Sequence, residues 1–144
     1  PAEWPRHIGH EARSARLLKD VGQRLRVPLA CQELADVVAR EHGHIHGSGG
    51  LSPAATLRLL ERCDAIRKPE RFAQALLACE CDARGRLGHE ERDYPQAQRL
   101  AAALKAVLAV DTSVVAAAAM ADGLSGPRIG ERIHQARVDA LQAL

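Results

Sequence analysis

Five of the seven prolines in this chain stand where a stretch of helical apolar spacing begins: Pro28, Pro53, Pro69, Pro95 and Pro127. Proline is tolerated in the first turn of a helix, because the N–H that it lacks would have no partner there. Further inside a helix it removes a hydrogen bond and clashes with the preceding turn. The prolines therefore predict a chain of separate helices, each starting at or next to a proline.

Apolar residues recur every three or four positions between these starts, and no stretch alternates as a strand would. Alanine and leucine dominate, and Trp4, Phe72 and Tyr94 are the only aromatic residues. Such a composition favours helix over strand. We expect an all-α single domain of about seven helices, with polar, Gly-containing loops at 43–50 and 84–94. The expected helices are about 11–26, 28–42, 53–67, 69–83, 95–108, 112–123 and 127–144.

The composition shifts near Tyr94, where His and Gly give way to Ala. We interpret residues 1–94 as the region that bears the site, and residues 95–144 as a helical tail that packs on it. The four cysteines, at positions 31, 63, 79 and 81, have no disulfide or zinc spacing and are expected to be buried, reduced thiols of a cytoplasmic protein. No signal peptide or membrane-spanning run is present.

Two histidines, His10 and His42, stand at the start of one expected helix and at the end of the next. In an antiparallel pair these two ends lie side by side, so both imidazoles can hold one divalent ion. Such an ion makes bound water a nucleophile near neutral pH. The alternative is that they are surface or helix-terminal residues. His44 and His46 follow in what is expected to be a loop, where they would capture adventitious metal; His46 is a weaker candidate for a second ligand.

Asp64 and Asp82 are the acids that would complete such a site. Asp64 lies on an otherwise apolar face, where an unpaired carboxylate is costly. Its alternative role is an ion pair with Arg67 or Lys68, and that of Asp82 is an ion pair with Arg86. The sequence does not separate these possibilities.

Arginine supplies 17 of the 20 cations, although the net charge is only +2. Arg58 and Arg62 are one helical turn apart, and Arg84 and Arg86 follow in a loop. Arginine binds phosphate through two parallel hydrogen bonds. These four residues are candidate phosphate or RNA contacts, and the small number of aromatic residues favours structured RNA over unpaired bases. The alternative is a solvated surface on which nearby glutamates balance the arginines.

Several motifs in chain order resemble the C-terminal part of the bacterial CCA-adding enzymes, tRNA nucleotidyltransferases that carry an HD phosphohydrolase domain. The resemblance covers nearly all 144 residues and is strongest up to Pro95. The motifs are WPRHIGH at 4–10, QRLRVP at 23–28, IH at 45–46, LLERCDAIRKP at 59–69 and CDARGR at 81–86.

The resemblance implies an HD-like first half in which His10 and His42 are catalytic metal ligands and Asp64 or Asp82 is the last ligand. The metal would be Ni, Mg, Mn, Co or Zn. The family's His-Asp doublet is absent from these 144 residues and would precede Pro1, as would the nucleotidyltransferase head, which uses Mg with CTP and ATP. Gly43 replaces the acid that the family often has beside the second His, which argues against a dinuclear site.

The implied activity is phosphatase, nucleotidase or cyclic phosphodiesterase, with tRNA and a phosphoester or nucleotide as partners and with weak or no activity in the isolated chain. Apolar surface around Trp4 and Ile8 would support a homodimer, and no membrane is involved. Two other interpretations stay open: a non-catalytic module that positions tRNA, and a helical metal-binding or interaction domain.

Overall fold

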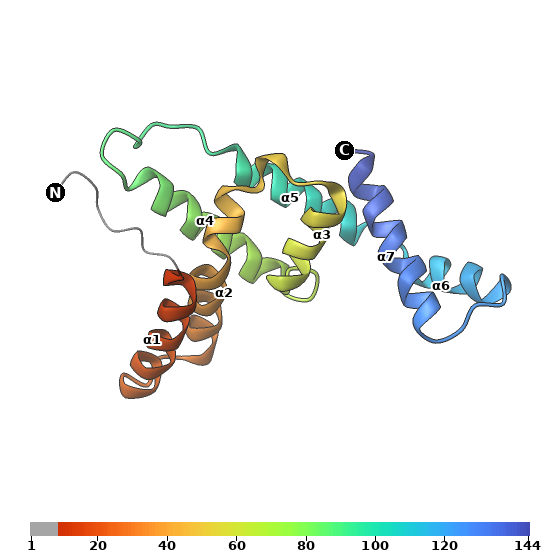
Figure 1. The fold of residues 1–144 in the computed structure, drawn as a ribbon, viewed down its shortest axis with the longest axis horizontal. Coiled ribbons are helices and arrows are strands. Elements are labelled where there is room, and N and C mark those ends of the chain that lie inside the picture. Colours follow the sequence, from red (N-terminus) through yellow and green to blue (C-terminus); the bar gives the residue numbers. More distant parts are fainter. Residues whose placement is uncertain (1–8) are drawn as a thin grey trace.

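The computed structural model describes residues 9–144, and this part of the chain contains seven α-helices, one short 3-10 helix and no strand (Figure 1). The expected all-α fold of about seven helices is confirmed. The helices are α1 (His10–Arg24), α2 (Leu29–His46), α3 (Pro53–Arg62), α4 (Pro69–Arg84), α5 (Pro95–Leu108), α6 (Thr112–Ala121) and α7 (Pro127–Gln142), and the 3-10 turn is Ser48–Gly50.

Local signals start most of the helices. Proline occupies the first turn of α3, α4, α5 and α7. The Ser52 side chain accepts a hydrogen bond from the Ala55 N–H at the start of α3, and Asp111 accepts from two N–H groups at the start of α6. Such caps satisfy N–H groups that have no partner within the helix. Pro28 lies one residue before α2, as its N-cap.

The expected end of the second helix before Gly43 is wrong, because α2 continues to His46. Glycine inside a helix costs about 1 kcal/mol relative to alanine. The turn that follows Gly43 offsets this cost by placing Ile45 in the core with no exposed surface. The extra turn also puts His42 and His46 on one helix face.

The third helix ends earlier than expected, at Arg62 rather than near Arg67. Asp64 adopts a left-handed conformation, φ 54°. The N–H of Ala65 then donates to the Leu60 carbonyl, and that of Asp64 to Glu61, which closes the helix end.

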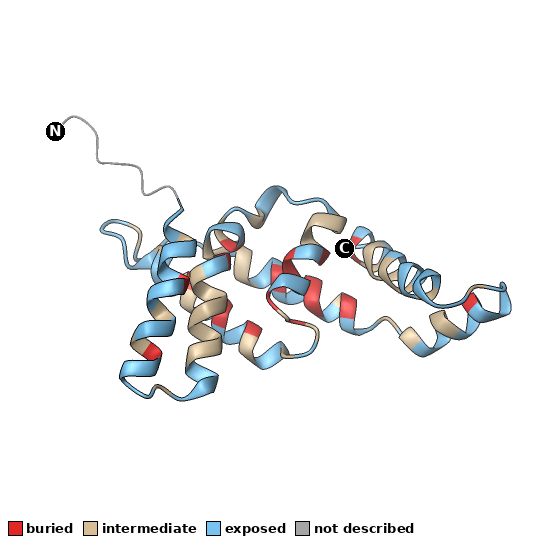
Figure 2. Cartoon of the chain, turned by 60° about the horizontal axis from the view of Figure 1, so that its bottom comes forward, coloured by how far each residue is buried: buried red, intermediate tan, exposed pale blue. Residues whose placement is uncertain are grey.

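The helices form an elongated arrangement in which α1 and α2 make an antiparallel arm that projects from the body (Figure 1). Buried residues concentrate where α2, α3, α4 and α5 meet, and the arm and the α6–α7 end are mostly exposed or half-buried (Figure 2). The core comprises Ile45, Leu57, Leu59, Leu60, Cys63, Ala65, Phe72, Leu76, Cys79, Leu100, Ala103, Leu104, Val107 and Leu141.

The core includes residues on both sides of position 94, so 1–94 and 95–144 share one packed interior. Their separate roles stay a prediction. Trp4 and Ile8, expected to expose an apolar edge, lie outside the described residues. Among residues 9–144, no single helix is long and apolar enough to cross a bilayer; α5 and α6 pass that test only as a pair bent by 47°.

Two of the four cysteines are buried, and the expectation for the other two is wrong. Cys63 and Cys79 lie in the core, and Cys31 and Cys81 are exposed. Burial raises the pKa of Cys63 to about 12 and that of Cys79 to about 11.

We expect an alkylating reagent at about pH 8 to modify Cys31 and Cys81 in the folded chain and to spare Cys63 and Cys79, which are almost entirely protonated there. Mass spectrometry of native and denatured samples measures this. Rapid modification of Cys63 before unfolding would contradict the packing of the core.

Candidate metal and phosphate site

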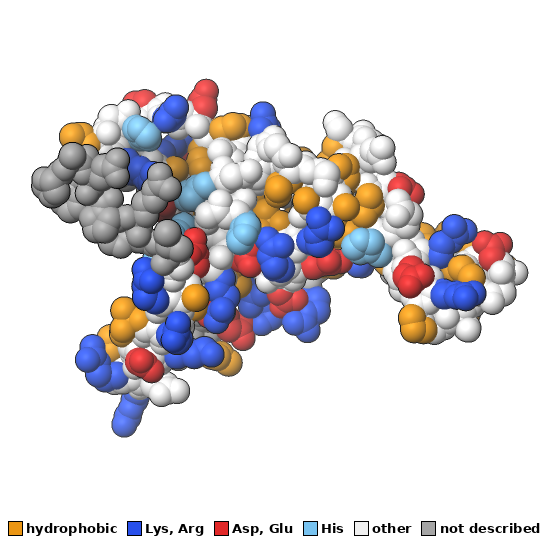
Figure 3. All heavy atoms as spheres, viewed as in Figure 1, with side chains coloured by type: hydrophobic (Ala, Val, Ile, Leu, Met, Phe, Trp, Pro, Cys, Tyr) orange, Lys and Arg blue, Asp and Glu red, His pale blue; other side chains and the backbone are white. Residues whose placement is uncertain are grey.

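His10 and His42 meet where the first turn of α1 lies beside the last turns of α2. Their Nε2 atoms are 3.1 Å apart, and the ring planes are inclined by 64°. The expected convergence of these two imidazoles is therefore present. Figure 3 shows several histidine side chains on this face of the molecule, near the α1–α2 arm.

The hydrogen bonds of His42 fix which of its nitrogens faces His10. Nδ1 lies 3.0 Å from the Val38 carbonyl one turn earlier, so it carries the proton and donates. The Nε2 lone pair is then directed at His10. A bond from Nδ1 to a carbonyl is the usual way in which proteins orient a ligating imidazole.

The 3.1 Å separation of the two Nε2 atoms fits two ligands of one ion. Nitrogens that each lie about 2.0–2.1 Å from a shared metal end roughly 3 Å apart. The same spacing accommodates a shared proton. Two lone pairs facing each other at this distance would repel, so either a metal ion lies between the rings or one Nε2 carries a hydrogen and donates it to the other.

No group of three or more His, Cys, Asp and Glu side chains within residues 9–144 is arranged to hold a metal ion. The two imidazoles could thus offer two ligands, and neither predicted acid joins them. Asp64 pairs instead with Arg67 and Arg71. The hydrogen bonds from Arg67 hold the pKa of Asp64 below its usual value.

Asp82 contacts His46 rather than the His10–His42 pair. The His46 Nε2 lies 3.0 Å from an Asp82 carboxylate oxygen, and its Nδ1 lies 2.8 Å from the Tyr94 hydroxyl. Asp82 is also 3.8 Å from Arg86, the partner suggested by the sequence. His46 in turn packs edge-on against His42, with ring centroids 5.9 Å apart. Asp82 is therefore connected to the His10–His42 pair through His46, whereas Asp64 pairs with arginines.

Asp82 determines the tautomer of neutral His46, because its carboxylate only accepts and His46 Nε2 therefore donates to it. His46 Nδ1 then accepts from the Tyr94 hydroxyl. Burial, with a smaller contribution from the neighbouring Cys79 and Asp82, raises the pKa of the Tyr94 phenol. The Gln96 side chain donates to the His46 backbone carbonyl, which ties the end of α2 to α5.

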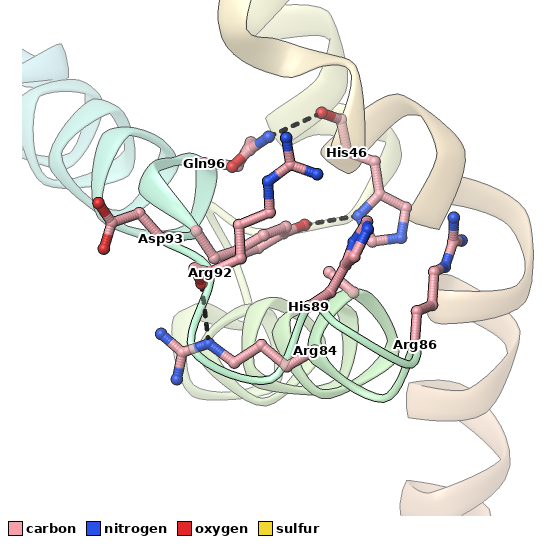
Figure 4. Close-up of a pocket in the computed structure, with 9 residues that line it drawn as sticks. His46, Arg84, Arg86, His89, Arg92, Asp93 and Gln96 are labelled. Carbon is pink, nitrogen blue, oxygen red and sulfur yellow. Dashed lines mark hydrogen bonds between the residues drawn. The ribbon is translucent and has the colours of Figure 1, made fainter.

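A basic pocket of about 290 Å³ opens beside His46, between the end of α2 and the loop that joins α4 to α5 (Figure 4). Its lining contains one carboxylate, Asp93, against three guanidinium groups. The volume and charge suit a small phosphorylated ligand. The lining residues are His46, Ala83, Arg84, Arg86, His89, Arg92, Asp93, Tyr94 and Gln96.

The structure places the four predicted phosphate contacts in different environments. Arg84 and Arg86 line the pocket, although Arg84 also pairs with Glu80 at 2.9 Å. Arg62 lies elsewhere, bound by two hydrogen bonds to Glu41, whose side chain is almost fully buried. Arg58 is exposed on α3.

Most of the basic stretch near Arg62 is neutralised by acids rather than free for RNA. Lys68 and Arg71 both bind Glu33. The hydrogen bond from Lys68 makes the largest contribution to lowering the pKa of Glu33, and the bond from Arg71 lowers it further. Arg67 binds Asp64. Balancing by glutamates was the alternative interpretation of the sequence, but the partners come from α2 and the α3–α4 turn.

Sequence reasoning missed His89, Tyr94 and Gln96 as members of the pocket, whereas Arg92 was expected with Arg84 and Arg86 in the basic loop. Its one available signal was Tyr94, a rare aromatic residue directly before a helix-starting proline. Pairing with His46 spans 48 positions, which no local pattern predicts.

Comparison with known proteins finds close sequence relatives, although no family model and no solved structure match the chain. It is 70% identical over 138 residues to the multifunctional CCA protein of Polaromonas naphthalenivorans, and 63% identical over 144 residues to that of Variovorax paradoxus. These matches cover 96% and 100% of the chain. The chain spans about a third of the length of the relatives, 32% and 34% respectively.

Proposed function

Because the chain is homologous to about a third of the multifunctional CCA proteins, which confirms the resemblance in its sequence, we propose that it is the C-terminal helical part of a CCA-adding tRNA nucleotidyltransferase. We further propose that it carries part of a metal-dependent HD phosphohydrolase site. The observation that supports the second proposal is the 3.1 Å approach of His10 Nε2 to His42 Nε2.

In this proposal His10 and His42 hold one divalent ion, and its other ligands come from residues outside those described. When bound, the ion would lower the pKa of coordinated water and polarise a phosphoryl oxygen. The chain's own residues orient the ligands: the Val38 carbonyl fixes His42, and His46 packs against it with Asp82 and Tyr94 behind.

The basic pocket supplies the binding of substrate phosphate in this proposal. Arg86 and Arg92 line it, and Arg84 donates from Nε to the Arg92 carbonyl, which holds the loop against the helix end. Guanidinium groups neutralise phosphate charge and fix its orientation. A phosphoester bound there would lie next to His46, on the side of α2 that also bears His42.

The experiment is to assay the full-length protein that carries this chain for hydrolysis of phosphomonoesters and cyclic phosphodiesters, after chelation and after return of Ni, Mn, Co, Zn or Mg. We expect activity to be lost on chelation and restored by at least one of these ions. Absence of hydrolysis with every ion, in protein that still adds CCA, would leave only the tRNA part of the proposal.

Replacing Arg86 by alanine tests the pocket. Its side chain is two-thirds exposed and its ion pair with Asp82 is long, so the fold should tolerate the change. We expect the KM for a phosphomonoester to rise by roughly tenfold, with kcat changed less. Arg128→Ala, which removes an exposed arginine of α7, is the control. An unchanged KM for Arg86→Ala would remove this arginine from substrate binding.

The lack of a third ligand among residues 9–144 favours a second candidate, a module that positions tRNA without catalysis. It predicts RNA binding by the chain whether or not metal is present.

A further inference from the structure

Positively charged residues are dense on α1 and the turn that follows it. Residues 10–26 hold five cations, at positions 13, 16, 19, 24 and 26, against the carboxylates Glu11 and Asp20. This local excess is larger than the net charge of the whole chain, +2. The arm projects from the body, and Lys and Arg side chains are prominent on it (Figures 1 and 3).

The cations of α1 and its following turn differ from those of the basic stretch at 62–71. Within the described part of the chain, Arg16, Lys19, Arg24 and Arg26 are exposed and make no ion pair. In contrast, Arg62, Arg67, Lys68 and Arg71 are each bound to a carboxylate.

Helical spacing turns Arg16 and Arg24 away from the buried Ala15 and Gly22, which pack toward α2. Lys19 lies nearer to α2, at the edge of a groove that Glu33 and Asp36 also line. Gly22 lets the helices approach closely, since a Cβ there would come within 2.7 Å of the Gln32 side chain. The exposed face of α1 is thus presented on a rigid support, with Asp20 as the one acid between the two arginines.

Arg26, at the tip of the arm, has a backbone conformation that glycine adopts more easily. It adopts φ 51°, a conformation that costs most residues about 1 kcal/mol and that glycine adopts freely. The N–H groups of Arg26 and Val27 donate to Gln23 and Gly22 in the usual helix-ending pattern. Asp64 has a similar φ, but its side chain pairs with Arg67; no comparable contact explains Arg26 within residues 9–144.

We propose that the exposed surface of α1 and of the turn after it, which carries Arg16, Lys19, Arg24 and Arg26, docks on the phosphate backbone of double-helical RNA. The choice of RNA rests on the proposed function, and the charge and position of the face rest on the structure. Exposed cations on a rigid helix suit backbone contact, and no aromatic residue is available on α1 to stack on bases.

A lipid surface fits this face less well than RNA. The apolar stripe of α1 is turned toward α2, so it cannot enter a bilayer. Leu17 and Leu25 remain exposed, at 63% each, but they are separated along the helix. An interfacial helix needs a continuous apolar face.

The test is fluorescence anisotropy of a labelled short RNA duplex titrated with the 144-residue chain at several salt concentrations. The triple variant R16Q/K19Q/R24Q should bind roughly tenfold or more weakly, with a salt slope reduced by about two. The control R99Q/K105Q/R128Q removes three exposed cations from other helices and should bind nearly as the wild type does.

Two single variants separate binding from stability. Arg26→Gly should leave the free energy of unfolding unchanged or higher, because glycine relieves the left-handed backbone, yet weaken RNA binding several-fold. Asp20→Asn removes the acid on the face and should strengthen binding several-fold.

Equal weakening by the two triple variants, or binding of phosphatidylserine vesicles in place of the duplex, would overturn the proposal. His42→Ala should bind the duplex as the wild type does. A wild-type protein that hydrolyses no phosphoester but shows the α1 effect contradicts only the hydrolase proposal, and one that hydrolyses phosphoesters without an α1 effect contradicts only the RNA-docking proposal.

Discussion

Replacing His42 by alanine is expected to lower the metal-dependent phosphohydrolase activity of the full-length protein by more than about a hundredfold, while CCA addition continues. His42 supplies one of the two imidazoles that face each other at 3.1 Å, and its Nδ1 is already committed to the Val38 carbonyl. Alanine leaves the helix intact, because it has a higher helix propensity than histidine. The loss is therefore expected in metal binding and chemistry rather than in folding.

His44→Ala is the matched control for that variant. His44 lies on the same helix two residues later, and its side chain is 64% exposed. It contacts Glu41. Both variants should be assayed for phosphomonoester hydrolysis and for CCA addition. Equal activity of the two variants would remove His42 from the site.

Replacing Phe72 by alanine is expected to destabilise the chain by about 3–5 kcal/mol, the usual cost of truncating a buried aromatic residue. Phe72 is the largest of the fully buried side chains, with 1% of its surface exposed. It lies on α4 in the core that joins α2, α3, α5 and α7. The cavity would therefore weaken contacts among most of the helices at once.

Leu77→Ala on the same helix is the control for the loss of apolar side-chain atoms. Leu77 is 60% exposed, so its truncation should change the free energy of unfolding by no more than about 0.5 kcal/mol. Urea unfolding followed by far-UV circular dichroism measures both variants. A Phe72→Ala midpoint close to that of Leu77→Ala would contradict the assignment of this core.

Helix starts were predictable because their causes are local. Pro53, Pro69 and Pro127 act on the turn that they begin, and Ser52 caps the same turn that it precedes in sequence. The end of α2 was not predictable in this way. Gly43 signals a stop, and the burial of Ile45 that overrides it depends on helices far along the chain.

In the candidate site, too, the features with local causes were predictable and those with long-range causes were not. Convergence of His10 and His42 follows from two consecutive antiparallel helices, which the sequence pattern indicates. The roles of the acids do not follow from it, since Asp64 depends on Arg71 of the next helix and Asp82 on His46 of α2. The pocket also depends on Tyr94, whose partner lies 48 positions away.

A crystal structure of the protein with Ni²⁺, with the ion located by its anomalous scattering, tests the shared-ion account most directly. The account predicts one ion between the two rings, with Nε2 of His10 and Nε2 of His42 both about 2.0–2.2 Å from it. An ion held by His44 or His46 alone, with the His10 and His42 rings joined to each other and to no metal, would contradict it.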